Sequence, residues 1–245
     1  MSERKTISDS KKAFYNAFSS VIPPIYRRIT DELLVELHLL SHSNDFEQGA
    51  IFAVGLCKVF DAFTRGYRPE KHLVSLFEAI CKSNGFDPAS LRDKSIRTQN
   101  AIKGYSFNEI LLFLKTNGVD TPEILSGDVK ALSKGNKQYS RLITIGLLSL
   151  LEEASKGNKS DKESINSEIK EICEIFGFQV SRVERDIKQY TTNLEKLEQA
   201  LDLFKESVAY ERKKKESKVS TVTEQSNLNH NTNSTDLEAD QVNNS

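Results

Sequence analysis

The sequence predicts an all-α fold: a multi-helix bundle with a long C-terminal coiled-coil helix and a disordered tail. Apolar residues recur every three or four positions through most of the chain, between capping residues and glycine or proline stops. This is the pattern of amphipathic helices. No segment shows the sustained two-residue alternation of a strand bounded by hairpin turns. We therefore expect a bundle of seven to nine helices and no sheet.

Composition sets the class of protein. Of the 245 residues, 38% are hydrophobic and 28% are charged, which is ordinary for a globular chain and too apolar for a disordered one. The formal net charge of -1 gives no overall attraction to nucleic acid, so we expect no nucleic-acid partner. The cysteines lie far apart among apolar residues, and we expect buried, reduced thiols at Cys57, Cys81 and Cys173.

No targeting or membrane-spanning segment is expected. The first residues carry charges with no apolar stretch behind them, so they do not form a signal peptide. The longest apolar run, residues 142–151, falls well short of the roughly 20 residues that span a bilayer. These observations predict a soluble protein with no transmembrane segment.

Proline and glycine place the first helices. Pro24 is tolerated in a first helical turn because its missing N–H has no partner there. An apolar face follows from Ile25 to Leu40. A second helix carries the apolar residues from Phe52 to Phe63 and ends at Gly66, where glycine readily forms a left-handed cap. A weaker helical pattern runs over residues 88–103.

Three capping boxes mark later helix starts, at residues 106–109, 160–163 and 181–184. In each, a serine and a glutamate satisfy free backbone N–H groups. Residues 119–137 are the least patterned interior stretch, and we expect a long loop with one helical turn. From Tyr139 to Glu153 the sequence is apolar nearly all round, which predicts the central buried helix.

The most regular pattern lies near the C-terminus. Its apolar residues alternate four and three positions apart: Val183, Ile187, Tyr190, Leu194, Leu197, Leu201, Phe204 and Val208. A repeat of this kind forms the seam of a left-handed coiled coil. The seam can fold back on the chain's own bundle, pair with a second copy or dock on another protein. Tyr190 and Phe204 are bulky for a two-stranded seam, which disfavours a symmetric dimer.

We predict three parts of the chain: a helical bundle over residues 1–177, a coiled-coil helix over 178–216 and a disordered polar tail over 217–245. The tail cannot bury enough apolar surface to offset its ordering entropy. The basic run Arg212–Lys215 is expected to complement the helix dipole at its C-terminus. Contact with anionic lipid head groups is the alternative.

We expect no catalytic residues, no cofactor and no metal, and therefore no enzyme. The chain has no GxxxxGK[ST], GxGxxG or GxSxG motif. One metal hypothesis remains, because His38 and His42 lie four residues apart and Glu36 adds a carboxylate nearby. No HExxH motif accompanies them. Partly exposed histidines at the edge of an apolar face are therefore the preferred interpretation.

Basic and aromatic residues gather near two helix ends. The candidate partner-binding residues are Tyr26, Arg27, Arg28, Arg65, Tyr67 and Arg68. Tyrosine and arginine are the residue types that most often anchor interfaces. The structural alternative is that the tyrosines cover the end of the bundle while the arginines pair with nearby carboxylates.

Several segments carry a resemblance to a known family: Ser8–Tyr15, Pro24–Arg28, Glu32–Leu40, Gly66–Pro69, Gly85–Pro88, Tyr139–Leu142, Ile145–Leu147, Leu150–Glu152 and Asn193–Leu201. In this order they resemble the thylakoid formation family, also called the photosystem II biogenesis protein family, of cyanobacteria and chloroplasts. The resemblance covers residues 6 to 212.

The resemblance implies a helical protein attached peripherally to the cytoplasmic side of the thylakoid membrane, with a role in photosystem II assembly and repair. It implies an adaptor that binds and stabilises the FtsH membrane protease complex, with photosystem II components as further partners. A peripheral lipid-binding protein of the thylakoid surface is the alternative. Chloroplast members carry a transit peptide that this chain lacks, so it resembles a cyanobacterial member. The family has no established catalytic residues to carry over.

Overall fold

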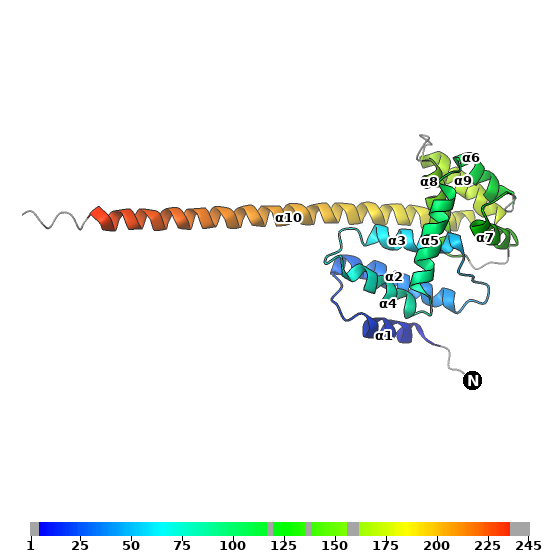
Figure 1. Ribbon diagram of the computed structural model, residues 1–245, viewed down its shortest axis with the longest axis horizontal. Helices are drawn as coiled ribbons and strands as arrows, with labels where there is room; N and C mark the ends of the chain where they lie inside the picture. Colours follow the sequence, from blue (N-terminus) through cyan, green and yellow to red (C-terminus); the bar gives the residue numbers. More distant parts are fainter. Residues whose placement is uncertain (1–4, 117–119, 136–138, 156–161, 236–245) are drawn as a thin grey trace, which may run out of the picture. The chain divides into compact units, whose positions relative to one another are not determined.

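The computed structural model describes residues 5–116, 120–135, 139–155 and 162–235 (Figure 1). It describes side chains up to residue 214, except those of residues 162–164 and 166. Over these ranges the all-α prediction is confirmed, with ten helices where seven to nine were expected. The helices are α1 (Ile7–Ala17), α2 (Pro24–Ser41), α3 (Ala50–Phe63), α4 (His72–Lys82), α5 (Pro88–Ile102), α6 (Phe107–Lys115), α7 (Glu123–Ser133), α8 (Arg141–Ser155), α9 (Lys162–Ile175) and α10 (Val180–Thr235).

Contacts within the chain divide it into two units, Met1–Glu195 and Lys196–Ser245. The boundary falls inside α10, which begins in the first unit and continues in the second. The boundaries after residues 177 and 216 stay predictions. Helix α10 continues through residues 217–235 of the predicted tail, whose side chains the structure does not describe, and residues 236–245 lie outside the described ranges.

Helix α1 is a difference from the sequence analysis, which places no helix there. The helix begins with a capping box, in which the Thr6 hydroxyl accepts a hydrogen bond from the Asp9 N–H and the Asp9 carboxylate accepts one from the Thr6 N–H. Within α1 only Ser10 and Phe14 are buried. The helix therefore lacks the wide apolar face that periodicity detects.

The expected loop over residues 119–137 is wrong in its described part, because α7 occupies most of it. Leu125, Val129 and Leu132 are buried on one face of this helix. Gly127 hides the pattern, since glycine is a poor helix former that packing can override. The predicted capping box at 181–184 is also wrong, because α10 begins at Val180 and Ser181 therefore lies inside the helix. The box at 160–163 lies outside the described side chains.

Helices α3 and α8 form the centre of the first unit. Every residue of α3 is buried except Lys58 and Asp61, and α8 is buried from Leu142 to Leu148. The prediction of a central buried helix in this region is confirmed. A Cβ on Gly55 of α3 would lie 1.8 Å from the Leu142 carbonyl oxygen. The two backbones therefore touch, and only glycine fits between them.

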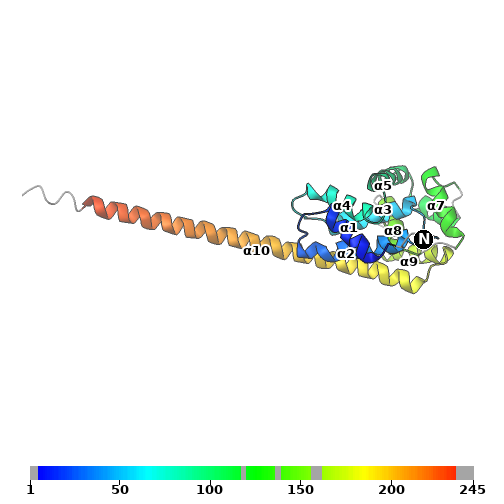
Figure 2. The same ribbon diagram turned by 90° about the horizontal axis from the view of Figure 1, so that it is seen from below.

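The contact is reciprocal. A Cβ on Gly146 of α8 would lie 2.1 Å from the carbonyl oxygen of Ile51 in α3. The other helices pack around this pair: α5 crosses α3 (Figure 1), while α6 and α9 pack on α8. Helix α1 lies against α2 and α4, and the view from below shows it between them (Figure 2). The buried pair is therefore the packing surface for α5, α6, α7 and α9, while α1, α2 and α4 pack on one another.

We expect Gly55→Ala and Gly146→Ala to destabilise the fold, because each new methyl group meets a backbone carbonyl of the facing helix. Overpacking of this kind typically costs about 1–3 kcal/mol in the free energy of unfolding. Denaturant unfolding followed by circular dichroism measures the change.

The matched control is Gly127→Ala in α7, where nothing lies within 4 Å of the added Cβ. Alanine is favoured over glycine inside a helix by about 0.5–1 kcal/mol, so this variant should be as stable as the wild type or more so. Equal unfolding midpoints for Gly55→Ala, Gly146→Ala and the wild type would contradict the close contact.

Candidate functional site

The candidate tyrosines meet where the start of α2 contacts the loop after α3. The ring centroids of Tyr26 and Tyr67 are 5.0 Å apart, and the Tyr26 hydroxyl donates to the carbonyl oxygen of Arg65 at 3.2 Å. Tyr26 is 3% exposed and Tyr67 is 1% exposed. Burial raises the pKa of both phenols. The two tyrosines therefore support this end of the bundle and are not offered on the surface.

The candidate arginines are exposed: Arg27, Arg28, Arg65 and Arg68. Arg28 donates to Glu32 at 2.8 Å, one turn further along α2. Arg68 pairs with Glu70. Exposed ion pairs of this kind contribute at most about 1 kcal/mol each. Carboxylates of a partner can therefore replace the internal ones at little cost.

The metal hypothesis depends on two histidines and a glutamate, and the structure directs the glutamate away from the histidines. His38 and His42 lie together, with ring centroids 4.3 Å apart. The Glu36 carboxylate instead accepts from Arg141 at 2.6 Å. His38 is only 7% exposed, and its Nδ1 lies 3.0 Å from Ser10 Oγ of α1. The expectation of partial exposure is wrong for His38, and no described group of three His, Cys, Asp or Glu residues could hold a metal ion.

A charged network joins α2 to the start of α8, and the sequence analysis does not find it. Arg141 donates to Glu36 at 2.6 Å and to Glu32 at 3.0 Å, while the Ser140 hydroxyl donates to Glu36 at 2.9 Å. Burial opposes the charge of Arg141, but the two carboxylates outweigh it and raise the pKa of the guanidinium. The partners lie far apart in the sequence, so no local motif marks them.

Tyr139 extends this network to α10. Its hydroxyl donates to Asp186 at 2.7 Å, and the guanidinium carbon of Arg182 lies 4.4 Å from the centre of its ring. The Thr144 hydroxyl donates to the Tyr139 oxygen at 3.2 Å. Burial, together with the nearby Asp186, raises the pKa of Tyr139. These contacts fix the first turns of α10 to the start of α8.

The network lines a groove, which we call the α2–α10 groove, with a cavity volume of about 570 Å³. The apolar lining comes from Val35, Leu39 and Leu40 of α2. The charged and polar lining includes Asp31, Glu32, Glu36, Arg141, Arg182, Asp186 and Gln189. Leu39 is 59% exposed.

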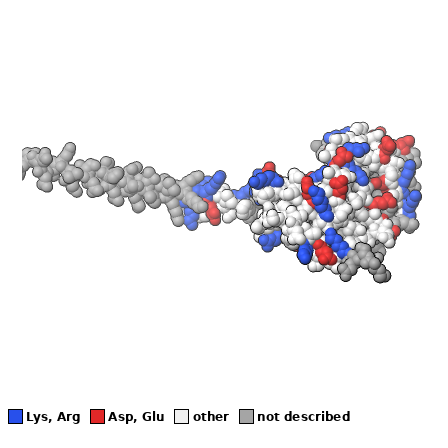
Figure 3. All heavy atoms as spheres, turned by 60° about the horizontal axis from the view of Figure 1, so that its bottom comes forward, with Lys and Arg blue, Asp and Glu red and all other residues white. Residues whose placement is uncertain are grey.

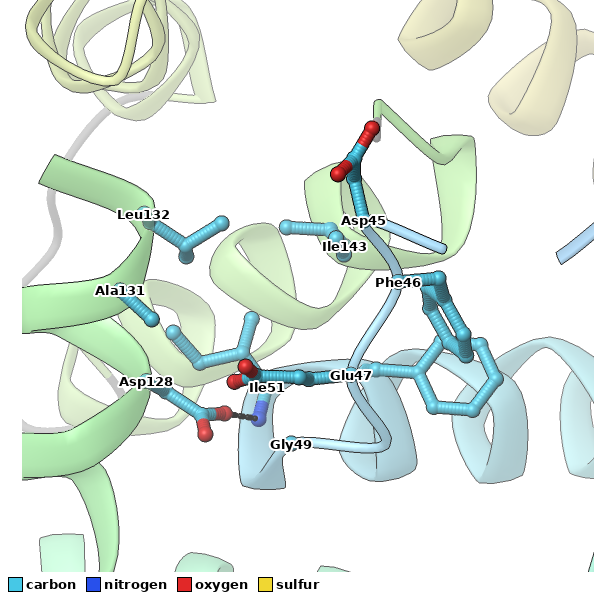
Figure 4. A pocket seen from close by; sticks show the side chains of 10 residues that line it. Asp45, Phe46, Glu47, Gly49, Ile51, Asp128, Ala131, Leu132 and Ile143 are labelled. Atoms are coloured by element: carbon cyan, nitrogen blue, oxygen red, sulfur yellow. Dashed lines mark hydrogen bonds between the residues drawn. The ribbon is translucent and has the colours of Figure 1, made fainter. Parts of the chain in front are cut away.

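A smaller cavity lies at the start of α3 (Figure 4). Gly49 has no side chain to cap this helix, and the Asp128 carboxylate of α7 accepts from the Ile51 N–H at 2.8 Å instead. Burial raises the pKa of Asp128 even though this hydrogen bond and the charge of Lys94 lower it. The cavity volume is about 30 Å³, room for a water molecule. We therefore assign this cavity to the fold and not to a ligand.

The first half of the predicted seam packs within the first unit. Val183 is fully buried and Ile187 is 6% exposed. The ring of Tyr190 packs edge-on against Phe63 of α3, with centroids 5.7 Å apart. Leu194 is partly exposed. This part of the seam is therefore covered by the chain's own bundle.

The second half of the seam lies in the second unit. Leu197 is buried and Leu201 is partly exposed, whereas Phe204 is 68% exposed and Val208 is 41% exposed. The three cations from Arg212 to Lys214 are exposed, and Figure 3 shows positive side chains gathered at the end of the described part of α10. This segment presents apolar residues followed by positive charge.

The cysteines confirm the sequence analysis, since Cys57, Cys81 and Cys173 are buried and free. Burial raises the pKa of Cys57, and it raises the pKa values of Cys81 and Cys173 to about 12, so none is a reactive thiolate. In the part of the chain that is described, no helix has the length and apolar character needed to cross a membrane.

These features define an all-helical protein built on a buried helix pair, with several exposed surfaces of different chemistry. Its sequence matches the thylakoid formation protein family model over residues 6–219. Protein Thf1 of Prochlorococcus marinus (strain MIT 9313) is 46% identical over 88% of this chain and 89% of that protein. Protein Thf1 of Nostoc punctiforme (strain ATCC 29133 / PCC 73102) is 34% identical over 88% of this chain and 93% of that protein.

A solved structure of Psb29 is similar, with a TM-score of 0.72 and 33% sequence identity, over 86% of this chain and 98% of that chain. The chain therefore belongs to the thylakoid formation protein family. The resemblance found in the sequence is confirmed.

His38 should make stability depend on pH. Burial lowers its pKa, as do the nearby charges of His42 and Lys5, and Asp9 opposes them. Because the folded-state pKa lies below the ordinary value of 6.5, the stability contribution is present above that value and is lost as the pH falls through the folded-state pKa.

We expect His38→Gln, which does not titrate, to remove this loss. The measurement is the free energy of unfolding of both proteins as a function of pH, from neutral downwards. His42→Gln is the control, because it removes only one of the influences that lower the pKa of His38 and leaves the buried imidazole in place, so it should remove less of the slope. Parallel pH profiles for wild type and His38→Gln would contradict the prediction.

Proposed function

We propose that this protein is a non-enzymatic adaptor that binds and stabilises the FtsH membrane protease complex in photosystem II assembly and repair. In this proposal it acts peripherally, on the cytoplasmic side of the thylakoid membrane. Membership of the thylakoid formation protein family supports the cellular setting. The exposed arginines and the exposed end of the seam support binding to other proteins.

The observation that carries the adaptor proposal is the exposed end of the α10 seam. Phe204 and Val208 continue the pattern of Val183 and Ile187, yet they are exposed where the earlier residues are buried. Exposed apolar side chains at regular helical spacing are suited to a partner helix. We infer that a partner covers them.

The arginines form the second proposed contact. Arg28 and Arg68 have side chains 71% and 72% exposed. They flank the buried pair Tyr26 and Tyr67, which holds the loop after α3 against α2. A rigid base of this kind lowers the entropy cost of binding, because the backbone that carries the arginines is already ordered. Acidic groups of the partner would complete the contact.

We expect two variants of the full chain to recover less FtsH from solubilised cyanobacterial thylakoids in a pull-down. One is Arg28→Glu with Arg68→Glu, which reverses the charge of the proposed contact. The other is Phe204→Ser with Val208→Ser, which removes the apolar surface of the seam end. Mass spectrometry of the captured proteins provides the measurement.

The matched control reverses two cations of similar exposure elsewhere, Lys82→Glu with Arg97→Glu, whose side chains are 61% and 68% exposed. It should capture as much FtsH as the wild type. If the two test variants also capture FtsH fully, the proposed contact residues are wrong. If the wild type captures none, the adaptor proposal itself fails.

A second function, binding to anionic lipid at the thylakoid surface, is favoured by the composition of the second unit. The exposed aromatic residues Phe204 and Tyr210 precede the exposed cations Arg212, Lys213 and Lys214. Aromatic side chains prefer the interfacial zone of a bilayer, and each cation near an anionic surface contributes about 1 kcal/mol.

If lipid binding is the function, the wild type should float with vesicles that contain phosphatidylglycerol, and added salt should release it. The triple variant Arg212→Glu, Lys213→Glu, Lys214→Glu should stay unbound. The control reverses three exposed cations of the bundle, Lys71→Glu, Arg97→Glu and Lys103→Glu, and should still float. If added salt does not release the wild type and the triple variant still floats, electrostatic lipid binding is excluded.

A further inference from the structure

The α2–α10 groove belongs to neither proposed contact. It lies within the first unit, between two helices whose facing surfaces carry unlike side chains. Arg141 and Tyr139 fix its shape by tying the start of α8 to both helices. The groove is therefore held open by hydrogen bonds that do not require a ligand.

One carboxylate of the groove forms no ion pair within the described residues. Three of its four carboxylates already pair with cations: Glu32 and Glu36 with Arg141, and Asp31 with Lys11. Asp186 accepts from the Tyr139 hydroxyl, and within the described ranges no lysine or arginine forms an ion pair with it. The nearby Arg182 lies over the Tyr139 ring. A partly buried carboxylate that forms no ion pair favours a cationic ligand.

On the apolar side of the groove Leu40 is buried and Val35 is partly exposed, so Leu39 is the uncovered side chain. Leu39 is 59% exposed, and it lies on α2 with Val35 and Leu40, which also line the groove. Gln189 of α10 lines the groove as well, one turn after Asp186. A leucine-sized side chain placed over Leu39 would remove apolar surface from water. Each Å² buried in this way stabilises the complex by about 25 cal/mol. A groove between two helices accommodates a third helix, with apolar anchors inward and charges at its edge.

We propose that the α2–α10 groove docks a helical segment of a partner protein that brings a lysine or arginine to Asp186 and a leucine-sized apolar side chain to Leu39. The segment packs between α2 and the first turns of α10, and its cation forms a charge-assisted hydrogen bond with the free oxygen of Asp186. Gln189 supplies a second polar contact. This docking is independent of whether FtsH is the partner at the arginines or at the seam end.

The test uses the full chain and two synthetic helical peptides as probes. One carries leucines on one face with lysines beside them, and the other has every lysine replaced by glutamate. Fluorescence anisotropy measures the affinity of each. We expect the wild type to bind the lysine peptide at least about tenfold more tightly than the glutamate peptide, a factor that corresponds to about 1.4 kcal/mol.

Two variants test whether the peptide binds in the groove. Asp186→Asn keeps an acceptor for the Tyr139 hydroxyl but removes the charge, so it should lose most of the discrimination between the peptides. Leu39→Arg should lower the affinity for the lysine peptide by about tenfold or more, because it removes the apolar contact and adds charge repulsion. The control is Leu112→Arg on α6, where the leucine is similarly exposed, at 56%. It should bind as the wild type does.

The outcomes separate the alternatives. Equal affinity of the wild type for both peptides, no binding of either, or no effect of Leu39→Arg would overturn the proposal. Sedimentation of the protein without peptide covers the remaining occupant, a second copy of this chain. If the wild type is a dimer that Leu39→Arg dissociates, the groove is an interface between copies and the proposed partner is wrong.

Discussion

The structure depends on the direct backbone contact between α3 and α8. Gly55 and Gly146 each leave room for a carbonyl oxygen of the other helix, so the two helices approach more closely than side chains would allow. Both are buried nearly all round, and α5, α6, α7 and α9 each pack on one or both of them. The contact also fixes the start of α8. Ser140, Tyr139 and Arg141 lie there, and their hydrogen bonds reach α2 and α10. The groove geometry is therefore a consequence of how tightly the core is packed.

The exposed features differ in chemistry from one part of the chain to the next. The arginines beside the buried tyrosine pair offer positive charge, the α2–α10 groove offers a carboxylate beside a leucine, and the end of the seam offers apolar side chains. Charges of both signs alternate over the face of the bundle shown in Figure 3, so specificity comes from local groups and not from net charge. The chain thus presents separate surfaces of different chemistry.

Local signals in the sequence were reliable where backbone chemistry alone decided the outcome. The capping box of Ser106 and Glu109 opens α6, with both reciprocal hydrogen bonds present. Gly66 adopts a positive φ of 79° after α3, as a left-handed cap requires. The same reasoning missed α1 and α7, because their buried residues are few and polar residues or Gly127 interrupt the pattern. Both helices are stabilised by packing on other helices, α1 on α2 and α4, and α7 on α3 and α5.

By itself the sequence determined the helical class, the central buried helix, the apolar seam and membership of a family. Each of these follows from spacing or motifs within a short stretch of sequence. Such local patterns can be interpreted without knowing which helices pack together. Only the tertiary structure decided that Tyr26, Tyr67 and His38 are buried, that Arg141 is shared by two carboxylates, and that Asp186 lies opposite α2 in a groove. These properties depend on side chains brought together from distant helices. A spacing of three or four residues along the chain cannot reveal these contacts, because they form only when the core has folded.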